Sequence, residues 1–140
     1  QACVQALKDG LIDCIATDHA PHADFEKEKE FDHAPFGIVG LETAFPVLYK
    51  SLVLTKQITL ARLVDALSSA PAKVLNLPGG SLCEGKAADL TIIDLNQESL
   101  FTESSLLSKG KNTPWLNESF PAKVLVTICN GSISYQDENF

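Results

Sequence analysis

The sequence predicts an α/β fold in which helices and one buried strand are followed by a smaller, β-rich half. The strand is predicted at residues 11–17, a nearly continuous apolar run between Gly10 and a polar cluster, as is typical of a buried parallel strand. Residues 41–54 have apolar side chains at helical spacing. The dipeptide Asn130-Gly131 lies between two apolar runs and indicates an antiparallel hairpin in the second half.

The first part of the chain is predicted to contain a helix, the strand and a long loop. Residues 1–8 have helical character and stop at Asp9-Gly10, since glycine is the common residue just after a helix. Residues 18–37 are rich in charges and turn formers, so we expect a loop with one solvated helical turn at residues 26–30. A loop of this length is usually functional or mobile.

Helices are predicted after this loop. In the helix over residues 41–54, Pro46 falls in the first turns, where proline is best tolerated. Thr59 resembles the N-cap of a helix over residues 60–69, and residues 72–75 are expected to add a short helix. A buried parallel strand flanked by helices is the unit of an α/β barrel or of a doubly wound sheet.

The second half of the chain changes to β structure. Its predicted strands are residues 88–95, 124–129 and 132–135. The dipeptide Asn130-Gly131 joins the last two through a tight turn. We expect the boundary between the halves near residues 78–86, so the chain divides into residues 1–78 and residues 79–140.

Composition and charge exclude several classes of partner. The 140 residues include 18 acidic and 11 basic side chains, a formal charge of −7, whereas nucleic acids and anionic membranes require a basic surface. No apolar run approaches the ~20 residues that span a bilayer. The four cysteines form no C-x-x-C pair, so we expect buried free thiols and a cytoplasmic location rather than a disulfide framework.

Asp18 is the strongest candidate for chemistry. It lies just past the predicted strand at residues 11–17, with His19 and His22 close behind, and barrels place reactive groups at the C-terminal ends of their strands. A carboxylate there can bind a divalent metal, accept a proton, or do both in sequence. The alternative is that Asp18 only caps the next turn, but its position and the two histidines favour chemistry.

The roles of the histidines stay open at this point. His22 could bind a metal, contact an anionic group of a substrate, or be an ordinary polar loop residue. His19 would point away from Asp18, which favours a structural role over metal binding. Zinc hydrolases need about three protein ligands, and the chain has no H-x-H pair. Since the chain also starts as if within a helix and contains no Met, we expect a fragment of a longer protein.

Two segments of the sequence are distinctive: residues 15–22, IATDHAPH, and residues 34–43, APFGIVGLET. Both closely resemble bacterial dihydroorotases of the longer, class I type, in the amidohydrolase superfamily. Residues 85–94, GKAADLTIID, resemble the closing segment that amidohydrolases share more widely, and residues 111–115, KNTPW, also fit. The resemblance runs along the whole chain and corresponds to the C-terminal third of these enzymes.

The resemblance implies a reaction and an architecture. Dihydroorotases interconvert N-carbamoyl-L-aspartate and (S)-dihydroorotate in pyrimidine synthesis, with zinc held in a (β/α)8 barrel beside a small β-sandwich. Residues 11–18 would be the eighth barrel strand, and residues up to 78 would complete the last helices of the barrel. Residues 79–140 would supply C-terminal strands of the sandwich.

The resemblance also implies residue roles. Asp18 would be a zinc ligand and the general acid/base. His22 would contact the substrate carboxylate, and Phe36 and Gly37 would line the pyrimidine ring. The other zinc ligands and further substrate-binding residues would lie outside this chain. We therefore expect the isolated chain to be inactive and to expose apolar surface.

The resemblance further implies partners. The substrate would be a small molecule, and the full-length protein would be a homodimer or would associate with aspartate transcarbamoylase. Residues 24–34 form a charged loop between the two substrate-contacting segments. This loop could close over the site as a lid, or it could be a static surface loop.

Two alternatives to this interpretation are a sister enzyme of the same superfamily and, in a different functional class, a non-catalytic subunit. Hydantoinases and allantoinases, the sister cyclic amidases, share an Asp after the last strand, but the residues that follow it usually differ from Ala20-Pro21-His22. A non-catalytic dihydroorotase-like scaffold subunit tends to lose its metal and acid/base residues, whereas Asp18 and His22 are retained here. Both comparisons favour an enzyme of the dihydroorotase type.

Overall fold

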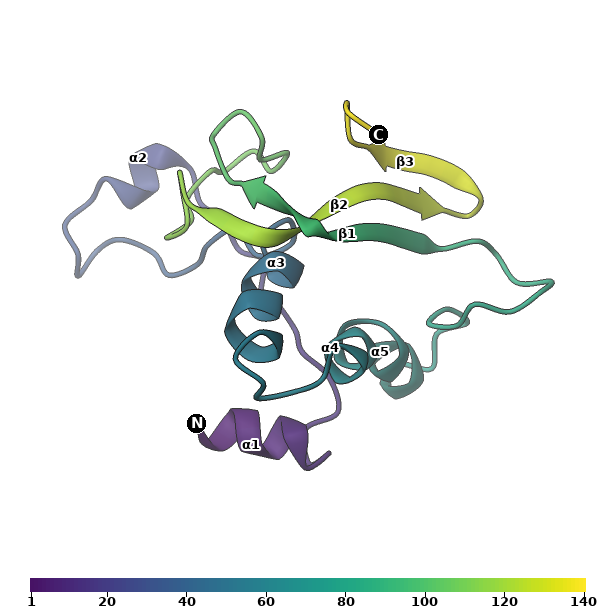
Figure 1. The fold of residues 1–140 in the computed structure, drawn as a ribbon. Helices are drawn as coiled ribbons and strands as arrows, with labels where there is room; N and C mark the ends of the chain where they lie inside the picture. The colour runs from purple at the N-terminus through teal and green to yellow at the C-terminus, as the bar shows by residue number, and fades with distance from the viewer.

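The computed structural model describes residues 1–140, and it places most of the helices below a three-stranded sheet (Figure 1). The helices come first along the chain: α1 (Ala2–Lys8), α2 (Asp24–Lys27), α3 (Ala44–Leu48), the π-helix η1 (Tyr49–Val53), α4 (Leu60–Leu67) and α5 (Ser69–Val74). The strands follow: β1 (Leu90–Leu100), β2 (Ser119–Cys129) and β3 (Ser132–Gln136). This order of helices and strands is that of an α/β chain.

The predicted helices are confirmed, although several of their ends differ. α1 stops two residues before Gly10, whose φ of +75° is the left-handed conformation that glycine adopts most easily. Thr59 caps α4 as predicted, because its Oγ1 accepts a hydrogen bond from the Arg62 amide at 3.1 Å. The helix predicted over residues 41–54 is α3 followed directly by η1, and Pro46 lies in its first turn.

Two short helices begin earlier than predicted. The turn expected at residues 26–30 forms as α2, where the Glu26 carboxylate accepts a hydrogen bond from the Ala23 amide at 3.1 Å. This contact stabilises the helix start as half of a capping box. The helix expected at residues 72–75 is α5, which already includes Pro71 in its first turn, where proline costs no intrahelical hydrogen bond.

The strand predicted at residues 11–17 is wrong for this chain. The segment is irregular and pairs with no strand; the Ile15 amide instead donates to the Ala66 carbonyl of α4 at 2.9 Å. The burial predicted for it is wrong as well, since Leu11 is 79% and Ile12 36% exposed. The physical reason is that a buried strand needs neighbouring strands for its amide and carbonyl groups, and the chain offers none here.

The sheet has the order β1-β2-β3 with both pairs antiparallel. The hairpin predicted at Asn130-Gly131 is confirmed, because these residues have φ values of +48° and +78°, the sign that a type I′ turn requires. β1 and β2 are longer than predicted and include Pro121. Proline is tolerated there because β3 pairs only with β2 from Val126 onward, which leaves this end of β2 with one open edge.

Two apolar cores hold the structure together. The first joins α1 to η1 and α4 and consists of Leu7, Leu52, Ile58, Leu63 and Ala66. The second joins the two halves of the chain and consists of Val39, Phe101, Leu106 and Phe120. The Lys50 ammonium of η1 also lies 4.4 Å above the centre of the Phe120 ring, a favourable cation–π distance.

Much apolar surface stays exposed, as expected for the isolated chain. The structure exposes 17 large apolar side chains, among them Leu82 and Phe36, against 13 buried apolar residues. The four cysteines are free thiols, but Cys3, Cys83 and Cys129 are exposed, so the predicted burial is wrong for these three. No helix combines the length and the apolar character that crossing a membrane requires.

Candidate active site

Asp18 lies at the end of the irregular segment that follows α1. Its φ of +46° is in the left-handed region, which aspartate tolerates better than most residues. The residue is exposed, and its carboxylate takes part in no hydrogen bond or ion pair. A carboxylate held in an unusual backbone conformation without a protein partner is available for a ligand, and such conformations are often found at functional sites.

The segment that leads to Asp18 is fixed by α4. The Arg62 guanidinium donates hydrogen bonds to the carbonyl oxygens of Ile12 and Asp13 at 2.6 Å and 3.1 Å. The amide of Ile15 donates to α4 in turn. The backbone before Asp18 is therefore attached to a helix rather than to a sheet.

His19 holds the next active-site segment in place. Its Nδ1 accepts hydrogen bonds from the amides of Gly40 and Leu41 at 3.0 Å and 3.2 Å, so the ring proton of the neutral imidazole is on Nε2. These contacts agree with the structural role predicted for His19. A short parallel bridge between His19 and Ile38 adds a hydrogen bond from the Ala20 amide to the Ile38 carbonyl at 3.1 Å.

Gly37 is required by the close approach of these two segments. A Cβ atom at this position would lie 2.1 Å from the Ala20 carbonyl oxygen, and the φ of Gly37 is +123°. Only glycine combines this backbone conformation with the absence of a side chain. The close approach that the structure shows at Gly37 is therefore that of the chain to itself, and the close approach of a substrate stays a prediction.

His22 is fixed through its backbone and has a half-buried side chain. Its amide donates to the Asn112 side-chain oxygen at 3.0 Å. Its Nδ1 lies 3.5 Å from a Glu26 carboxylate oxygen, and the imidazole is 30% exposed. The pair with Glu26 orients the ring and leaves Nε2 without a protein partner.

Phe36 projects into solvent, with 95% of the residue exposed. The neighbouring Gly37 carbonyl, in contrast, accepts hydrogen bonds from the Asn112 side-chain amide at 2.8 Å and from the Lys27 ammonium at 3.2 Å. The structure thus brings the backbones around Asp18, His22 and Gly37 together. It does not pack Phe36 against any of them.

Asn112 and Lys27 are the contacts that sequence reasoning missed. The KNTPW motif pointed to the neighbourhood of Asn112, but no local pattern gave that residue a role. From the sequence, Lys27 is only one charged residue of an expected solvated turn. In the structure its ammonium donates to the carbonyls of Pro35 and Gly37 at 2.8 Å and 3.2 Å. It therefore joins the two ends of the loop that contains α2.

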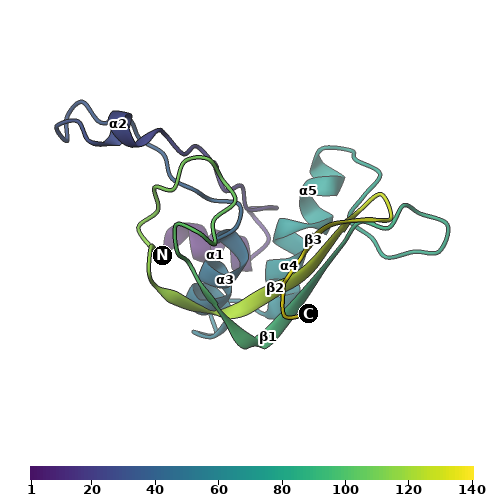
Figure 2. The same ribbon diagram turned by 90° about the horizontal axis from the view of Figure 1, so that it is seen from above.

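The loop over residues 24–34 begins with α2 and projects away from the body of the molecule in both ribbon views (Figures 1 and 2). Its base is held by Lys27 and by the pair between His22 and Glu26. The closure of this loop over a ligand stays a prediction.

The residues of this chain do not form a complete metal centre. No group of three His, Cys, Asp or Glu side chains comes together in the structure, whereas a zinc site needs about three protein ligands. Asp18 has the donor chemistry and the free carboxylate of one such ligand. The chain therefore suits a contribution to a metal site and does not complete one, and no reaction step through a metal follows from it.

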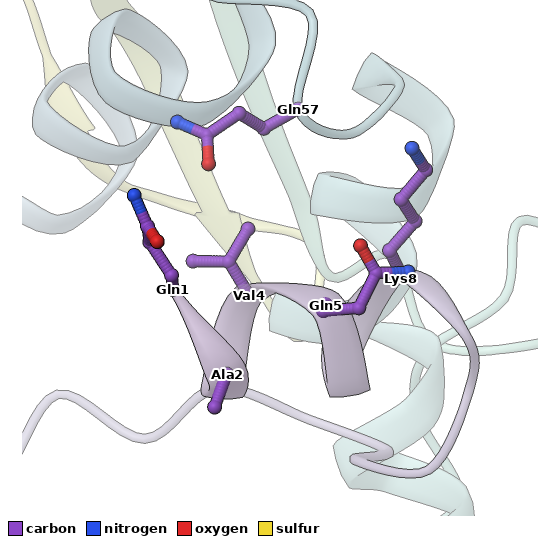
Figure 3. A pocket seen from close by; sticks show the side chains of 6 residues that line it. All are labelled: Gln1, Ala2, Val4, Gln5, Lys8 and Gln57. Carbon is purple, nitrogen blue, oxygen red and sulfur yellow. The ribbon is translucent and has the colours of Figure 1, made fainter.

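A separate open pocket lies between α1 and the turn after η1 (Figure 3). Its lining residues are Gln1, Ala2, Val4, Gln5, Lys8 and Gln57. In the close-up, Gln57 faces α1 across the pocket. None of the predicted site residues lines it, and its lining contains no carboxylate or histidine, so it offers no acid/base pair.

The chain is similar to known enzymes along nearly its whole length. Residues 1–133 match the sequence profile of the amidohydrolase family. A dihydroorotase of Bacillus pumilus is 47% identical over 137 residues, which cover 98% of this chain and 32% of that protein. A dihydroorotase of Bacillus cereus is 49% identical over 138 residues, with 99% and 32% covered. The chain thus spans about one third of the length of the curated relatives it matches.

Solved structures of related enzymes have the same fold. A D-hydantoinase from Thermus sp. superposes with a TM-score of 0.85 at 25% identity, covering 97% of this chain and 31% of that one. An L-hydantoinase from Arthrobacter aurescens gives a TM-score of 0.83 at 30% identity, covering 96% and 31%. The family profile, the curated relatives and the solved structures agree over the part of the chain that contains the Asp18 site and over the sheet. On these grounds the chain belongs to the amidohydrolase family.

Proposed function

We propose that this chain supplies part of the active site of a dihydroorotase, an enzyme that interconverts N-carbamoyl-L-aspartate and (S)-dihydroorotate. The observation that carries the proposal is the identity of 47–49% to Bacillus dihydroorotases along 98–99% of the chain. Since the chain covers 32% of those relatives, the activity proposed is that of the whole protein, and the 140 residues alone are expected to be inactive.

The architecture that goes with this function is a (β/α)8 barrel beside a small β-sandwich. In this proposal residues 1–78 contain the last barrel strand and its helices, and residues 79–140 contain strands of the sandwich. The irregular segment at residues 11–17 supports it, because its exposed Leu11 and Ile12 would be covered by neighbouring barrel strands. The TM-scores of 0.85 and 0.83 to hydantoinases also support it.

Asp18 is assigned the proton transfer. Ring closure forms a bond between the carbamoyl nitrogen and the carbon of the side-chain carboxylate and releases water; ring opening adds water across that bond. In ring opening, Asp18 would take a proton from the attacking water and deliver it to the ring nitrogen that leaves. Its carboxylate suits this role because it is exposed and makes no hydrogen bond or ion pair within the chain that would occupy its oxygens.

Zinc is the proposed cofactor, with Asp18 as one of its ligands. A bound zinc ion would polarise the amide carbonyl and stabilise the charge that develops on its oxygen. The remaining ligands would come from outside the chain, because no group of three His, Cys, Asp or Glu side chains comes together within it.

His22, Phe36 and Gly37 are assigned to substrate binding. The Nε2 of His22 has no protein partner, and in the protonated ring its N–H can donate to the free carboxylate of the substrate. Phe36 has an exposed ring that can cover the substrate ring. Gly37 has no side chain to obstruct the approach of the ring to the backbone.

The test is an assay of the complete gene product that contains this chain. Substrates would be N-carbamoyl-L-aspartate, dihydroorotate, hydantoin and allantoin, with the zinc content measured in parallel. We expect turnover of the first two and a kcat lowered by about 10²–10⁴-fold in Asp18→Asn. Asp13→Asn is the matched control, because Asp13 is an exposed aspartate of the same segment. Normal turnover by Asp18→Asn would refute the catalytic assignment.

A hydantoinase-type cyclic amidase is the second candidate function. The observation in its favour is the likeness to hydantoinase structures at 25–30% identity, which is lower than the identity to dihydroorotases. Turnover of hydantoin but not of dihydroorotate would establish this alternative. Under either function we propose a small-molecule substrate and a cytoplasmic protein with reduced thiols. Association with a second copy or with aspartate transcarbamoylase stays a prediction.

A further inference from the structure

A single side chain from the second half of the chain joins both segments assigned to substrate binding. The Asn112 Oδ1 accepts a hydrogen bond from the His22 amide at 3.0 Å, and its Nδ2 donates to the Gly37 carbonyl at 2.8 Å. Its own backbone carbonyl accepts from the Val39 amide at 2.9 Å. Three polar groups of one residue thus fix two segments that are separated in sequence by a projecting loop.

The chemistry of these contacts requires an amide. Of the two groups that the Asn112 side chain contacts, the His22 amide is a donor and the Gly37 carbonyl is an acceptor. Only a side chain that has an acceptor and a donor on one short stem satisfies both. A carboxylate at position 112 would keep the bond to His22 but would face the Gly37 carbonyl with a second acceptor.

The segment that contains Asn112 is itself anchored on both sides. Glu42 accepts hydrogen bonds from the amides of Leu107 and Ser108, the latter at 2.8 Å. The Lys111 ammonium donates to the Leu106 carbonyl. Leu106 is only 2% exposed in the second core. The position of the Asn112 amide is therefore determined by the packing of the two halves and not by a free loop.

Gly110 shows how closely this segment approaches the site. A Cβ atom at Gly110 would lie 2.8 Å from Pro21 Cβ and 2.9 Å from the His22 carbonyl oxygen. Both neighbours belong to the segment that begins at Asp18. Residues 110–112 are thus in direct contact with the backbone next to His22, and a methyl group at position 110 would push the two apart.

We propose that Asn112 is a positioning residue that sets the distance between His22 and the Phe36-Gly37 pair, and so determines how the substrate ring and its carboxylate are held together. The proposal rests on the dihydroorotase function proposed above. Asn112 makes no contact with the substrate in this scheme. Its effect is on binding in the ground state and in the transition state alike, which predicts a change in KM more than in kcat.

The experiment uses the complete enzyme that contains this chain, with Asn112→Asp as the main variant. We expect the KM for dihydroorotate to rise about tenfold, which corresponds to the loss of about one hydrogen bond, with kcat within about twofold of the wild type. Asn76→Asp is the matched control, because it makes the same chemical change at an exposed asparagine and should leave KM unchanged.

A second variant and a second readout separate positioning from folding. Gly110→Ala keeps the amide but displaces it, so KM should rise in the same direction. Amide hydrogen exchange at His22 should become faster in Gly110→Ala, which displaces the Asn112 side chain, and should stay slow in Asn112→Asp, whose carboxylate still accepts the His22 amide. The urea midpoint of the whole protein should stay close to that of the wild type in both variants. The proposal is overturned by an unchanged KM in folded Asn112→Asp, by a fall in kcat alone, or by loss of the fold in both variants.

These outcomes are distinct from failure of the proposed function. If the unmodified protein does not turn over dihydroorotate, the function is refuted whatever the variants do. If it does, and the KM of Asn112→Asp equals that of the wild type, only the positioning role is refuted. The hydrogen exchange at His22 tests the structural part of the inference in both cases.

Discussion

Arg62 attaches the segment before the candidate site to α4. The loss of stability that its removal causes can be worked out from its contacts. Its Nε donates to the Leu7 carbonyl at 3.0 Å, and one terminal nitrogen donates to the carbonyls of Ile12 and Asp13 at 2.6 Å and 3.1 Å. The other terminal nitrogen pairs with Asp65 at 2.6 Å. Arg62→Ala removes all four contacts at once.

The contacts of Arg62 differ in burial and therefore in strength. A hydrogen bond to a charged group contributes about 1.5–3 kcal/mol when buried. The bond to Leu7 is partly buried and the other two carbonyl bonds are exposed, so we assign about 1 kcal/mol to the first and about 0.5 kcal/mol to each of the others. The partly exposed pair with Asp65 adds about 0.3–0.5 kcal/mol. Together Arg62→Ala should lower the free energy of unfolding by about 2–3 kcal/mol.

The assay is urea unfolding of the 140-residue chain, monitored by circular dichroism. The expected loss corresponds to a midpoint lower by about 1–2 M. Arg62→Lys, which keeps the charge and one of the donors, should recover about half of the loss, and Asp65→Ala should cost less than about 0.5 kcal/mol. A loss below about 1 kcal/mol in Arg62→Ala would show that water satisfies the three carbonyls equally well, and the reasoning would be wrong.

Three further predictions concern single contacts. Gly37→Ala should cost at least about 2 kcal/mol and speed amide exchange at Ala20, because its Cβ would lie 2.1 Å from the Ala20 carbonyl oxygen. The hydrogen bond from Lys123 holds the pKa of Asp137 below its ordinary value of 3.8. This carboxylate therefore contributes stability that is present above pH 3.8 and is lost as the pH falls through the lower folded pKa; Asp137→Asn should abolish this part of the pH dependence of the urea midpoint. Thr59→Ala should lower the free energy of unfolding by about 1 kcal/mol, and Thr59→Ser should restore it.

Elements whose signal is local could be predicted from the sequence. Thr59 specifies the start of α4 because the cap depends only on the amide three residues later. Asn130-Gly131 specifies the hairpin because both residues tolerate positive φ. Asp18 stood out by its place after an apolar run, and the structure leaves its carboxylate free of protein partners.

Features that depend on distant partners could not be predicted in this way. The apolar run at residues 11–17 has the composition of a buried strand, but pairing depends on other strands, and the chain has none beside it. Asn112 has no local signature, since its two side-chain bonds join residues 90 and 75 positions away. Periodicity and composition describe a segment alone, whereas these properties belong to pairs of segments.

The distance along the chain between Asn112 and the segments it joins has a consequence for the order of folding. A contact across 90 residues can form only after a large loop has closed, and such contacts slow folding more than local ones. During synthesis, Asp18 and His22 emerge well before the asparagine that completes their surroundings. We therefore expect the helices to form first and the substrate-contacting backbone to become ordered last, once the second half of the chain has docked.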